Sequence, residues 1–197
     1  MEFQPLFDYI ARFIPLTDQE RSLVESKFKI RKFLKGQFVV QNGDTCKYES
    51  FVLSGCLKTF YIDNDGHEHI VMFAIEDWWT GDMYSFLTQT PGLYTIDALE
   101  DSELFCLEKN ALEELYTKIP KFEKFFRHLL QNAFIAGQRR IIESMSLAAD
   151  QRYCKFIEQF PLMEKRLPLK QIASYLGITP ESLSRIRSQY IKTEKSA

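Results

Sequence analysis

The spacing of apolar residues changes along the chain and divides it into segments of different kinds. Residues 7–28 have helical spacing, and Thr17 followed by Glu20 has the signature of a capping box at a helix start. Residues 29–108 instead contain short β-rich runs, spaced by roughly ten residues and separated by glycine turns. These runs are 38–40, 50–53, 57–62, 70–73 and 95–99. The pattern predicts an antiparallel barrel or jelly roll.

Helical spacing returns over residues 109–146, as a short helix and then a long one, with Ile119-Pro120 between them. In the first half of the long helix, apolar residues lie almost all round the surface rather than on one stripe. Such a helix needs two partners, and we expect the roll to be one and the same helix of a second subunit to be the other. The alternative is burial within a single chain. The 3–4 spacing predicts a subunit seam made of Phe126, Leu129, Ala133 and Ala136.

The last part of the chain begins near residue 148, with one helical segment over 149–160 followed by the stretch 169–188. In that stretch one face of a short helix is apolar. Gly177 then supplies a turn suited to the left-handed conformation, and Thr179 with Pro180 starts a second helix. Two helices joined by such a short turn form a helix-turn-helix.

The outer face of the second helix is polar and suits base edges and phosphates in a DNA major groove. The predicted DNA contacts are Lys170, Thr179, Pro180, Glu181, Ser182, Arg185 and Ser188. Residues 139–197 hold 11 basic and 6 acidic side chains, whereas residues 1–138 hold 14 basic and 21 acidic. A basic module on an acidic body indicates a polyanionic partner. A helical hairpin in a core and a protein–protein adaptor are the alternatives.

Composition excludes several other classes. With 45% hydrophobic and 26% charged residues among 197, the chain is expected to be globular. Its longest apolar run, Ile70–Ile75, is too short to span a bilayer, and its start has no secretory signal, so we expect a cytoplasmic protein without a membrane partner. The four cysteines are too widely spaced for zinc or an iron–sulfur cluster, and His67 with His69 makes a poor metal site. No metal, certain cofactor or catalytic residue is therefore predicted, and the protein is not expected to be an enzyme.

With these motifs in view, the chain resembles the Crp/Fnr family of bacterial transcription regulators. The stretch LPLKQIASYLGITPESLSRIRSQY is similar to the family's C-terminal motif, and the glycine turns with Gly81-Asp82 resemble the framework of its cyclic-nucleotide-binding β-roll. The resemblance implies an α+β fold with an N-terminal double-stranded β-helix (jelly roll), a long dimer helix and a C-terminal helix-turn-helix domain. It places these parts at 1–120, 121–147 and 148–197. It also implies double-stranded DNA, a second copy of the chain and RNA polymerase as partners.

The effector loop departs from the family pattern. Members that bind cyclic AMP have a loop with Gly-Glu near its start and Arg-Ser near its end, which clamps the phosphate. Here Gly81-Asp82 matches the start, but Pro91-Gly92-Leu93 has no arginine, and Arg139 and Arg140 are the nearest candidates to neutralise a phosphate. A buried phosphate without a guanidinium loses its bidentate partner, so we expect no cyclic AMP binding. The candidate effector contacts are Trp79, Gly81, Asp82, Met83, Tyr84, Gly92, Tyr94, Thr95 and Gln138.

The sequence therefore predicts a homodimeric, sequence-specific DNA-binding transcription regulator. Its sensory β-roll is expected either to bind an unidentified small-molecule effector other than cyclic AMP or to have lost sensing. The alternative is a cyclic-nucleotide or other small-molecule sensor that acts through protein partners rather than through DNA.

Overall fold

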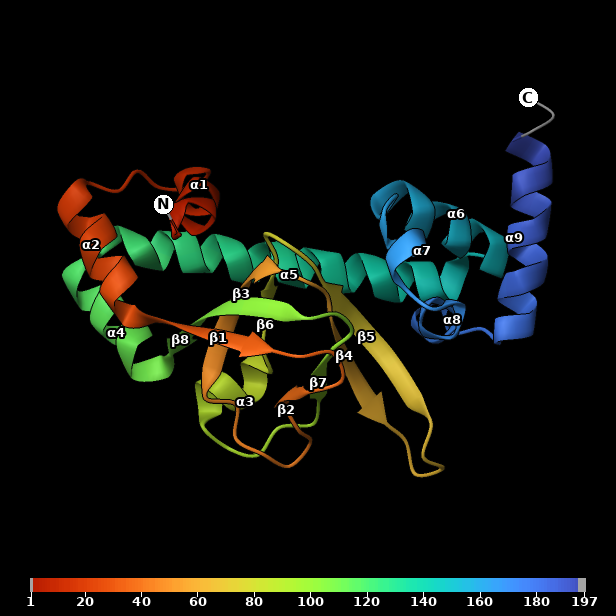
Figure 1. Cartoon of the computed structure of the whole chain (residues 1–197), viewed down its shortest axis with the longest axis horizontal. Coiled ribbons are helices and arrows are strands. Elements are labelled where there is room, and N and C mark those ends of the chain that lie inside the picture. The colour runs from red at the N-terminus through yellow and green to blue at the C-terminus, as the bar shows by residue number, and fades with distance from the viewer. Residues whose placement is uncertain (1, 195–197) are drawn as a thin grey trace. The chain divides into compact units, whose positions relative to one another are not determined.

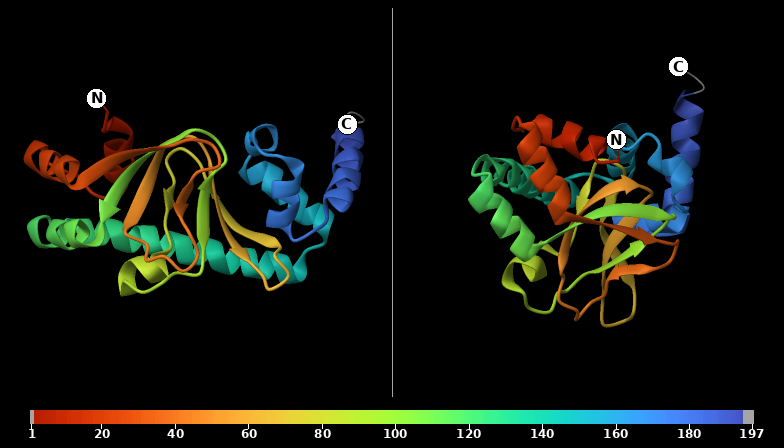
Figure 2. Two further views of the ribbon diagram at one scale, coloured as in Figure 1. Left: turned by 60° about the horizontal axis from the view of Figure 1, so that its bottom comes forward. Right: turned by 60° about the vertical axis from the view of Figure 1, so that its left-hand side comes forward.

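The computed structural model describes residues 2–194, and within them the chain forms two compact units (Figures 1 and 2). The first unit comprises the residues up to Tyr61 together with Val71–Asn132. The second comprises Ile62–Ile70 and the residues from Ala133 onward. The long helix α5, Lys121–Ser146, contributes residues to both units. In the described part of the chain, no helix has the length and apolar character needed to cross a membrane.

The first unit is a roll of two four-stranded sheets, ordered β1-β8-β3-β6 and β2-β7-β4-β5 (Figure 1). The strands are β1 Phe28–Phe33, β2 Phe38–Val40, β3 Tyr48–Ser54, β4 Leu57–Ile62, β5 Glu68–Ala74, β6 Trp79–Thr80, β7 Thr95–Ala98 and β8 Ser102–Glu108. The β3–β8 pairing is antiparallel and places Phe51 opposite Phe105. Between the sheets, Val52, Leu57 and Leu104 are fully buried in one apolar core. The predicted jelly roll is confirmed.

Helices cover one side of this roll with a second, aromatic core. They are α1 Gln4–Ala11, α2 Asp18–Lys27, α4 Lys109–Lys118 and the first half of α5, while α3 Met83–Thr88 lies in the loop after β6. Phe122 and Phe125 of α5 are fully buried in this core together with Phe51 and Phe105 of the sheet. These large rings account for much of the apolar area that stabilises the unit.

Local sequence signals placed several elements correctly. The five predicted strands are all present, and a proline separates α4 from α5 as expected. The helical segment expected over residues 7–28 is two helices, because Pro15 disfavours helix before it and Thr17 caps α2 with a complete capping box. Strands β1, β6 and β8 and helix α3 are not among the predicted elements. In β1, Arg31 and Lys32 are adjacent and interrupt the alternation of apolar and charged residues, and only the two ends of the strand are buried.

Of the subunit seam predicted on α5, the first half is covered by the chain itself and the second half is exposed. Phe126 is buried inside the chain's own aromatic core, and Leu129 packs against the same core. Periodicity shows that a face is apolar, but only the tertiary structure shows what covers it. In this protein the first unit covers Phe126 and Leu129, whereas Ala133 and Ala136 are exposed and their place in a seam stays a prediction.

The second unit is helical and has its own small core. Its helices are α6 Ala149–Gln159, α7 Met163–Arg166, α8 Leu169–Leu176 and α9 Pro180–Glu194, preceded by the end of α5. Phe156, Ile172 and Leu183 are buried where α6, α8 and α9 meet. The turn between β4 and β5, together with the adjoining strand ends (residues 62–70), belongs to this unit.

Candidate nucleic-acid interface and effector loop

A short turn dictated by local sequence joins α8 to α9. Gly177 ends α8 in the left-handed conformation with φ +66°, which costs a glycine little. The N–H of Ile178 donates to the carbonyl oxygen of Ala173 at 3.0 Å and closes the end of α8. Thr179 then caps α9, since its Oγ1 accepts from the N–H of Ser182 at 3.2 Å, and Pro180 begins the helix. The structure therefore contains the predicted helix-turn-helix.

The start of α9 presents a polar face to solvent. Glu181 and Arg185 are exposed, and Arg185 Nη2 donates to the Oγ of the half-buried Ser182 at 3.4 Å. Hydrogen bonds from its own backbone N–H and from the Thr179 hydroxyl hold the pKa of Glu181 below its ordinary value. This face therefore offers a cation, an anion and a hydroxyl side by side.

The other predicted DNA contacts divide into exposed and engaged side chains. Lys170 on α8 is exposed, and so is the start of α9 at Pro180. Ser188 Oγ donates to the carbonyl of Ser184 at 2.9 Å, so its proton is used inside the helix. Arg187, two residues after Arg185, instead pairs through Nε with Glu164 of α7 at 2.7 Å. The two arginines therefore have different roles: Arg187 ties α9 to its own unit, and Arg185 does not.

In the effector loop, Asp82 is committed to its own backbone. Its side chain is buried and caps α3, with Oδ1 accepting from the N–H of Ser85 at 3.0 Å. Its Oδ2 accepts from the N–H groups of Leu93 at 3.0 Å and Tyr94 at 3.3 Å. Three backbone donors that could bind an anion are thus satisfied by a carboxylate of the chain itself.

Two glycines allow this close packing. A Cβ at Gly92 would overlap the carboxylate of Asp82, and a Cβ at Gly81 would overlap that of Glu49. Glu49 is 2% exposed, and burial, together with the nearby charge of Asp82, raises its pKa to about 8. A side chain at residue 92, including the arginine that the sequence lacks, would therefore require the Asp82 carboxylate to move from its hydrogen bonds.

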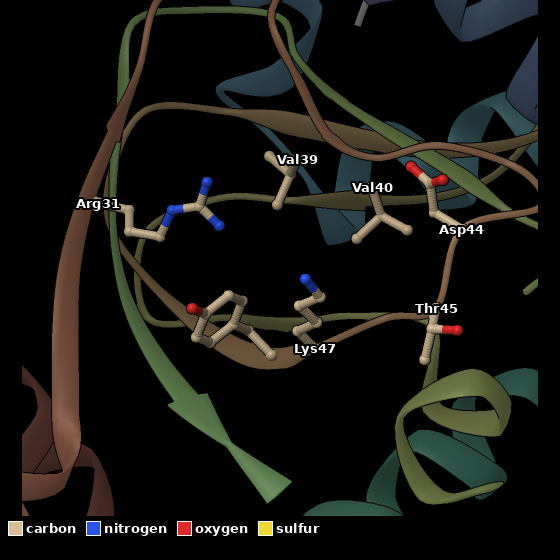
Figure 3. A pocket seen from close by; sticks show the side chains of 7 residues that line it. Arg31, Val39, Val40, Asp44, Thr45 and Lys47 are labelled. Atoms are coloured by element: carbon tan, nitrogen blue, oxygen red, sulfur yellow. The ribbon is translucent and has the colours of Figure 1, made fainter. Parts of the chain in front are cut away.

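A separate hollow of about 430 Å³ opens in the first unit near β1, β2 and the start of β3 (Figure 3). Its lining includes Arg31, Lys47 and Tyr48 together with Val39 and Val40. None of these residues was among the predicted effector contacts. Because β1 was not recognised as a strand, nothing in the sequence indicated that Arg31 would face this space.

Comparison with known proteins places this geometry in a family. Residues 30–118 match the model of the cyclic nucleotide-binding domain. Electron transport regulator A of Shewanella oneidensis is 28% identical over 193 residues, covering 89% of this chain and 73% of the relative. The structure of FixK2 from Bradyrhizobium japonicum superposes with a TM-score of 0.74 at 16% identity, over 85% of this chain and 86% of that one. The structure of a transcriptional regulator of the Crp/Fnr family from Eubacterium rectale superposes with a TM-score of 0.67 at 19% identity. The match covers 91% of this chain and 85% of that one.

Residues 30–118 thus match a cyclic nucleotide-binding domain, and the chain over most of its length is similar to regulators of the Crp/Fnr family. Among its predicted effector residues, the structure brings Asp82, Gly92 and Tyr94 together, with Gly81 and the half-buried Met83 on either side of Asp82. In this chain the Asp82 carboxylate binds the N–H groups of Leu93 and Tyr94, and the loop is closed on itself.

The remaining effector candidates take no part in the Asp82 hydrogen bonds. Trp79 is buried against Phe51, with ring centroids 5.7 Å apart. Tyr84 is 62% exposed, and the hydroxyl of buried Thr95 accepts from the N–H of Asn42 at 3.1 Å. Gln138 is exposed on the part of α5 that belongs to the second unit.

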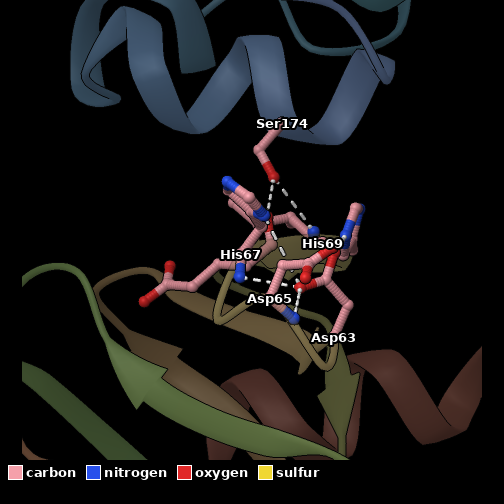
Figure 4. A network of polar contacts seen from close by, with 7 residues as sticks. Asp63, Asp65, His67, His69 and Ser174 are labelled. Atoms are coloured by element: carbon pink, nitrogen blue, oxygen red, sulfur yellow. Dashed lines mark hydrogen bonds and ion pairs between the residues drawn. The ribbon is translucent and has the colours of Figure 1, made fainter.

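Within the second unit, the turn between β4 and β5 bonds to the first helix of the helix-turn-helix (Figure 4). Ser174 Oγ of α8 donates to the carbonyl of Glu68 at 2.7 Å and accepts from the N–H of Ile70 at 3.2 Å. Arg140 donates to the carbonyls of Ile70 at 2.7 Å and Tyr175 at 3.0 Å and lies over the Tyr175 ring. Arg140, expected as a possible phosphate partner, is therefore engaged in holding this contact.

The same turn contains the group of described residues best placed to hold a metal ion. Ligand atoms of Asp63, Asp65 and His67 lie within 4.8 Å of one another, and His69 Nε2 is 2.6 Å from Asp63 Oδ2. The hydrogen bond with His69 lowers the pKa of Asp63 to about 2. Asp63 Oδ1 already accepts from the N–H groups of Asp65 and His67, as expected for an ordinary polar turn.

Proposed function

We propose that this protein is a homodimeric transcription regulator that reads a specific DNA sequence with α9. The observation that carries the proposal is the exposed face at the start of α9, where Arg185 makes no ion pair within the described residues. A guanidinium held on the outer face of the second helix of a helix-turn-helix can reach the O6 and N7 atoms of guanine. Lys170 on α8 is suited to a DNA phosphate.

An exposed apolar stripe on α5 supports the dimer. Five large apolar side chains on the second half of the helix are more than half exposed: Phe134, Ile135, Ile141, Ile142 and Met145. Positions 134, 138, 141 and 145 follow the alternating 4-3-4 spacing of a coiled-coil seam, with Gln138 as the polar member. We infer that the same helix of a second copy covers this stripe, because a two-fold axis matches a self-complementary seam.

The roll is proposed to sense a small molecule other than cyclic AMP. The loop that would clamp a cyclic nucleotide phosphate is filled by Asp82 and has no cation. A phosphate placed there would meet a carboxylate instead of a guanidinium. A regulator of this kind acts in the cytoplasm, with RNA polymerase as a further partner, and we propose no enzymatic role.

The test is selection of DNA sites from a random pool with the purified chain, followed by binding to the selected site and to unrelated DNA. Arg185→Ala should weaken the free energy of binding to the selected site by about 1–3 kcal/mol and relax the base preference there. Its binding to unrelated DNA should change little. Lys170→Ala should weaken binding to both DNAs and reduce the salt slope by about 1.

Lys155→Ala is the matched control, because Lys155 Nζ already pairs with Glu143 at 2.7 Å and its charge is locally balanced. It should bind the selected site about as well as the wild type. If no sequence is enriched, or if Arg185→Ala binds the selected site as tightly as the wild type, the proposal of DNA reading by α9 is wrong.

A further inference from the structure

The hollow near β1 and β3 brings two cations into one space with an apolar floor (Figure 3). Arg31 reaches it because side chains alternate along β1, and Arg31 shares the face of Phe33, which is buried in the core between the sheets. The Arg31 guanidinium lies 4.9 Å from the centre of the Phe33 ring and 5.3 Å from that of Tyr48. These rings fix the guanidinium in place without neutralising it.

Neighbouring cations on the same strand form ion pairs, whereas those in the hollow do not, although the charge of Lys47 helps to lower the pKa of Glu108. Lys29 pairs with Glu108 at 2.6 Å, and Lys32 pairs with Glu103 at 3.2 Å. Among the residues that the structure describes, neither Arg31 nor Lys47 has an ion-pair partner.

One carboxylate, that of Asp44, also lines the hollow, and it forms no ion pair with either cation. Two cations and one carboxylate leave the lining with one net positive charge. A monoanion would balance that charge, whereas a phosphate dianion would exceed it. Val39 and Val40 add apolar surface, and Thr45 is the remaining residue of the lining.

We propose that this hollow binds a small organic monocarboxylate with an apolar body. The planar Arg31 fork suits bidentate hydrogen bonding to a carboxylate, and Lys47 adds a second charge-assisted donor. The volume of about 430 Å³ falls in the range of small-molecule sites, and the valines and Tyr48 suit the apolar body. The role of this hollow as an effector site rests on the regulator function proposed above. Binding of the carboxylate, however, can be measured without DNA.

The experiment uses the full chain and two probes of equal shape: 2-naphthoate, an apolar monocarboxylate, and 2-naphthalenemethanol, its neutral analogue. Calorimetry should show saturable binding of the carboxylate and at least tenfold weaker binding of the alcohol. Arg31→Gln and Lys47→Gln should each weaken naphthoate binding by about 10- to 100-fold, the scale of one charge-assisted contact, and leave the alcohol unchanged.

Lys32→Gln is the matched control, since it removes the same charge one residue away on the opposite face of β1 and should leave naphthoate binding unchanged. Thermal unfolding of each variant checks that it is folded. The proposal is overturned if naphthoate does not bind, if the alcohol binds equally well, or if the two hollow variants bind naphthoate as the wild type does.

The same proteins are then tested on the selected DNA site. If the wild-type protein binds naphthoate but binds no DNA site specifically, the proposed regulator function is wrong and the proposed carboxylate site still holds. Naphthoate that changes the DNA affinity of the wild type, but not that of Arg31→Gln, would support both.

Discussion

Replacing Ile141 with glutamate tests whether the exposed stripe of α5 is the dimer seam. Ile141 is 60% exposed in the single chain, so the change should not disturb the fold of either unit. In a two-fold dimer, however, the two glutamates would lie near each other in a surface that excludes water. Both the lost apolar burial and the buried charges would oppose association.

The magnitude follows from the exposed area. Burying a whole isoleucine side chain is worth about 1.5–3 kcal/mol, so the exposed 60% of Ile141 is worth about 1–2 kcal/mol in each copy. Two copies lose about 2–4 kcal/mol, which raises the dimer dissociation constant about 30- to 700-fold. Taking two carboxylates out of water adds to this cost.

Sedimentation velocity over a concentration series measures the shift, and thermal unfolding shows whether the variant is still folded. Ala136→Glu is the control: Ala136 is also exposed, but it lies about 140° round the helix from Ile141. It should dimerise like the wild type. The seam is misplaced if Ile141→Glu stays as dimeric as the wild type, or if Ala136→Glu is the variant that dissociates.

Two further predictions concern stability. The raised pKa of about 8 means that folded Glu49 keeps a proton which the unfolded chain loses near pH 4.5, so stability should fall as pH rises from about 4.5 to 8. In the Glu49→Gln variant this decrease in stability with pH should be smaller. The prediction is contradicted if the melting temperatures of the wild type and the variant differ by the same amount at every pH from 5 to 9. Gly177→Ala should lower the free energy of unfolding by about 1–2 kcal/mol, because φ at this residue is +66°. Gly137→Ala, inside α5, is the control and should leave stability unchanged or raise it. Equal unfolding midpoints for the two variants would contradict the prediction.

Features set by a few adjacent residues could be predicted from sequence. The helix-turn-helix follows from Gly177, Thr179 and Pro180, and the capping box at Thr17 needs only Glu20. Each of these signals acts within one turn of chain, so no knowledge of tertiary packing is required.

Features set by distant residues could not be predicted in the same way. The apolar face of α5 at Phe126 is recognisable from the sequence, but part of its cover comes from Trp79, far away in the sequence, with ring centroids 6.2 Å apart. Arg31 faces the hollow only because β1 pairs with β8, which places Arg31 opposite Leu104. Hydrophobic spacing contains no information on such pairings.

The two departures in the effector loop, aspartate in place of glutamate and glycine in place of arginine, are one structural feature. Aspartate is a strong helix cap, and the shorter side chain of Asp82 reaches the N–H of Ser85 at the start of α3. Its other oxygen then accepts from the N–H groups of Leu93 and Tyr94, which places the carboxylate against Gly92. An arginine at residue 92 would need the space that Asp82 occupies. Asp82 therefore supplies a negative charge to the loop's own N–H groups and removes the room for the cation that a bound phosphate would need.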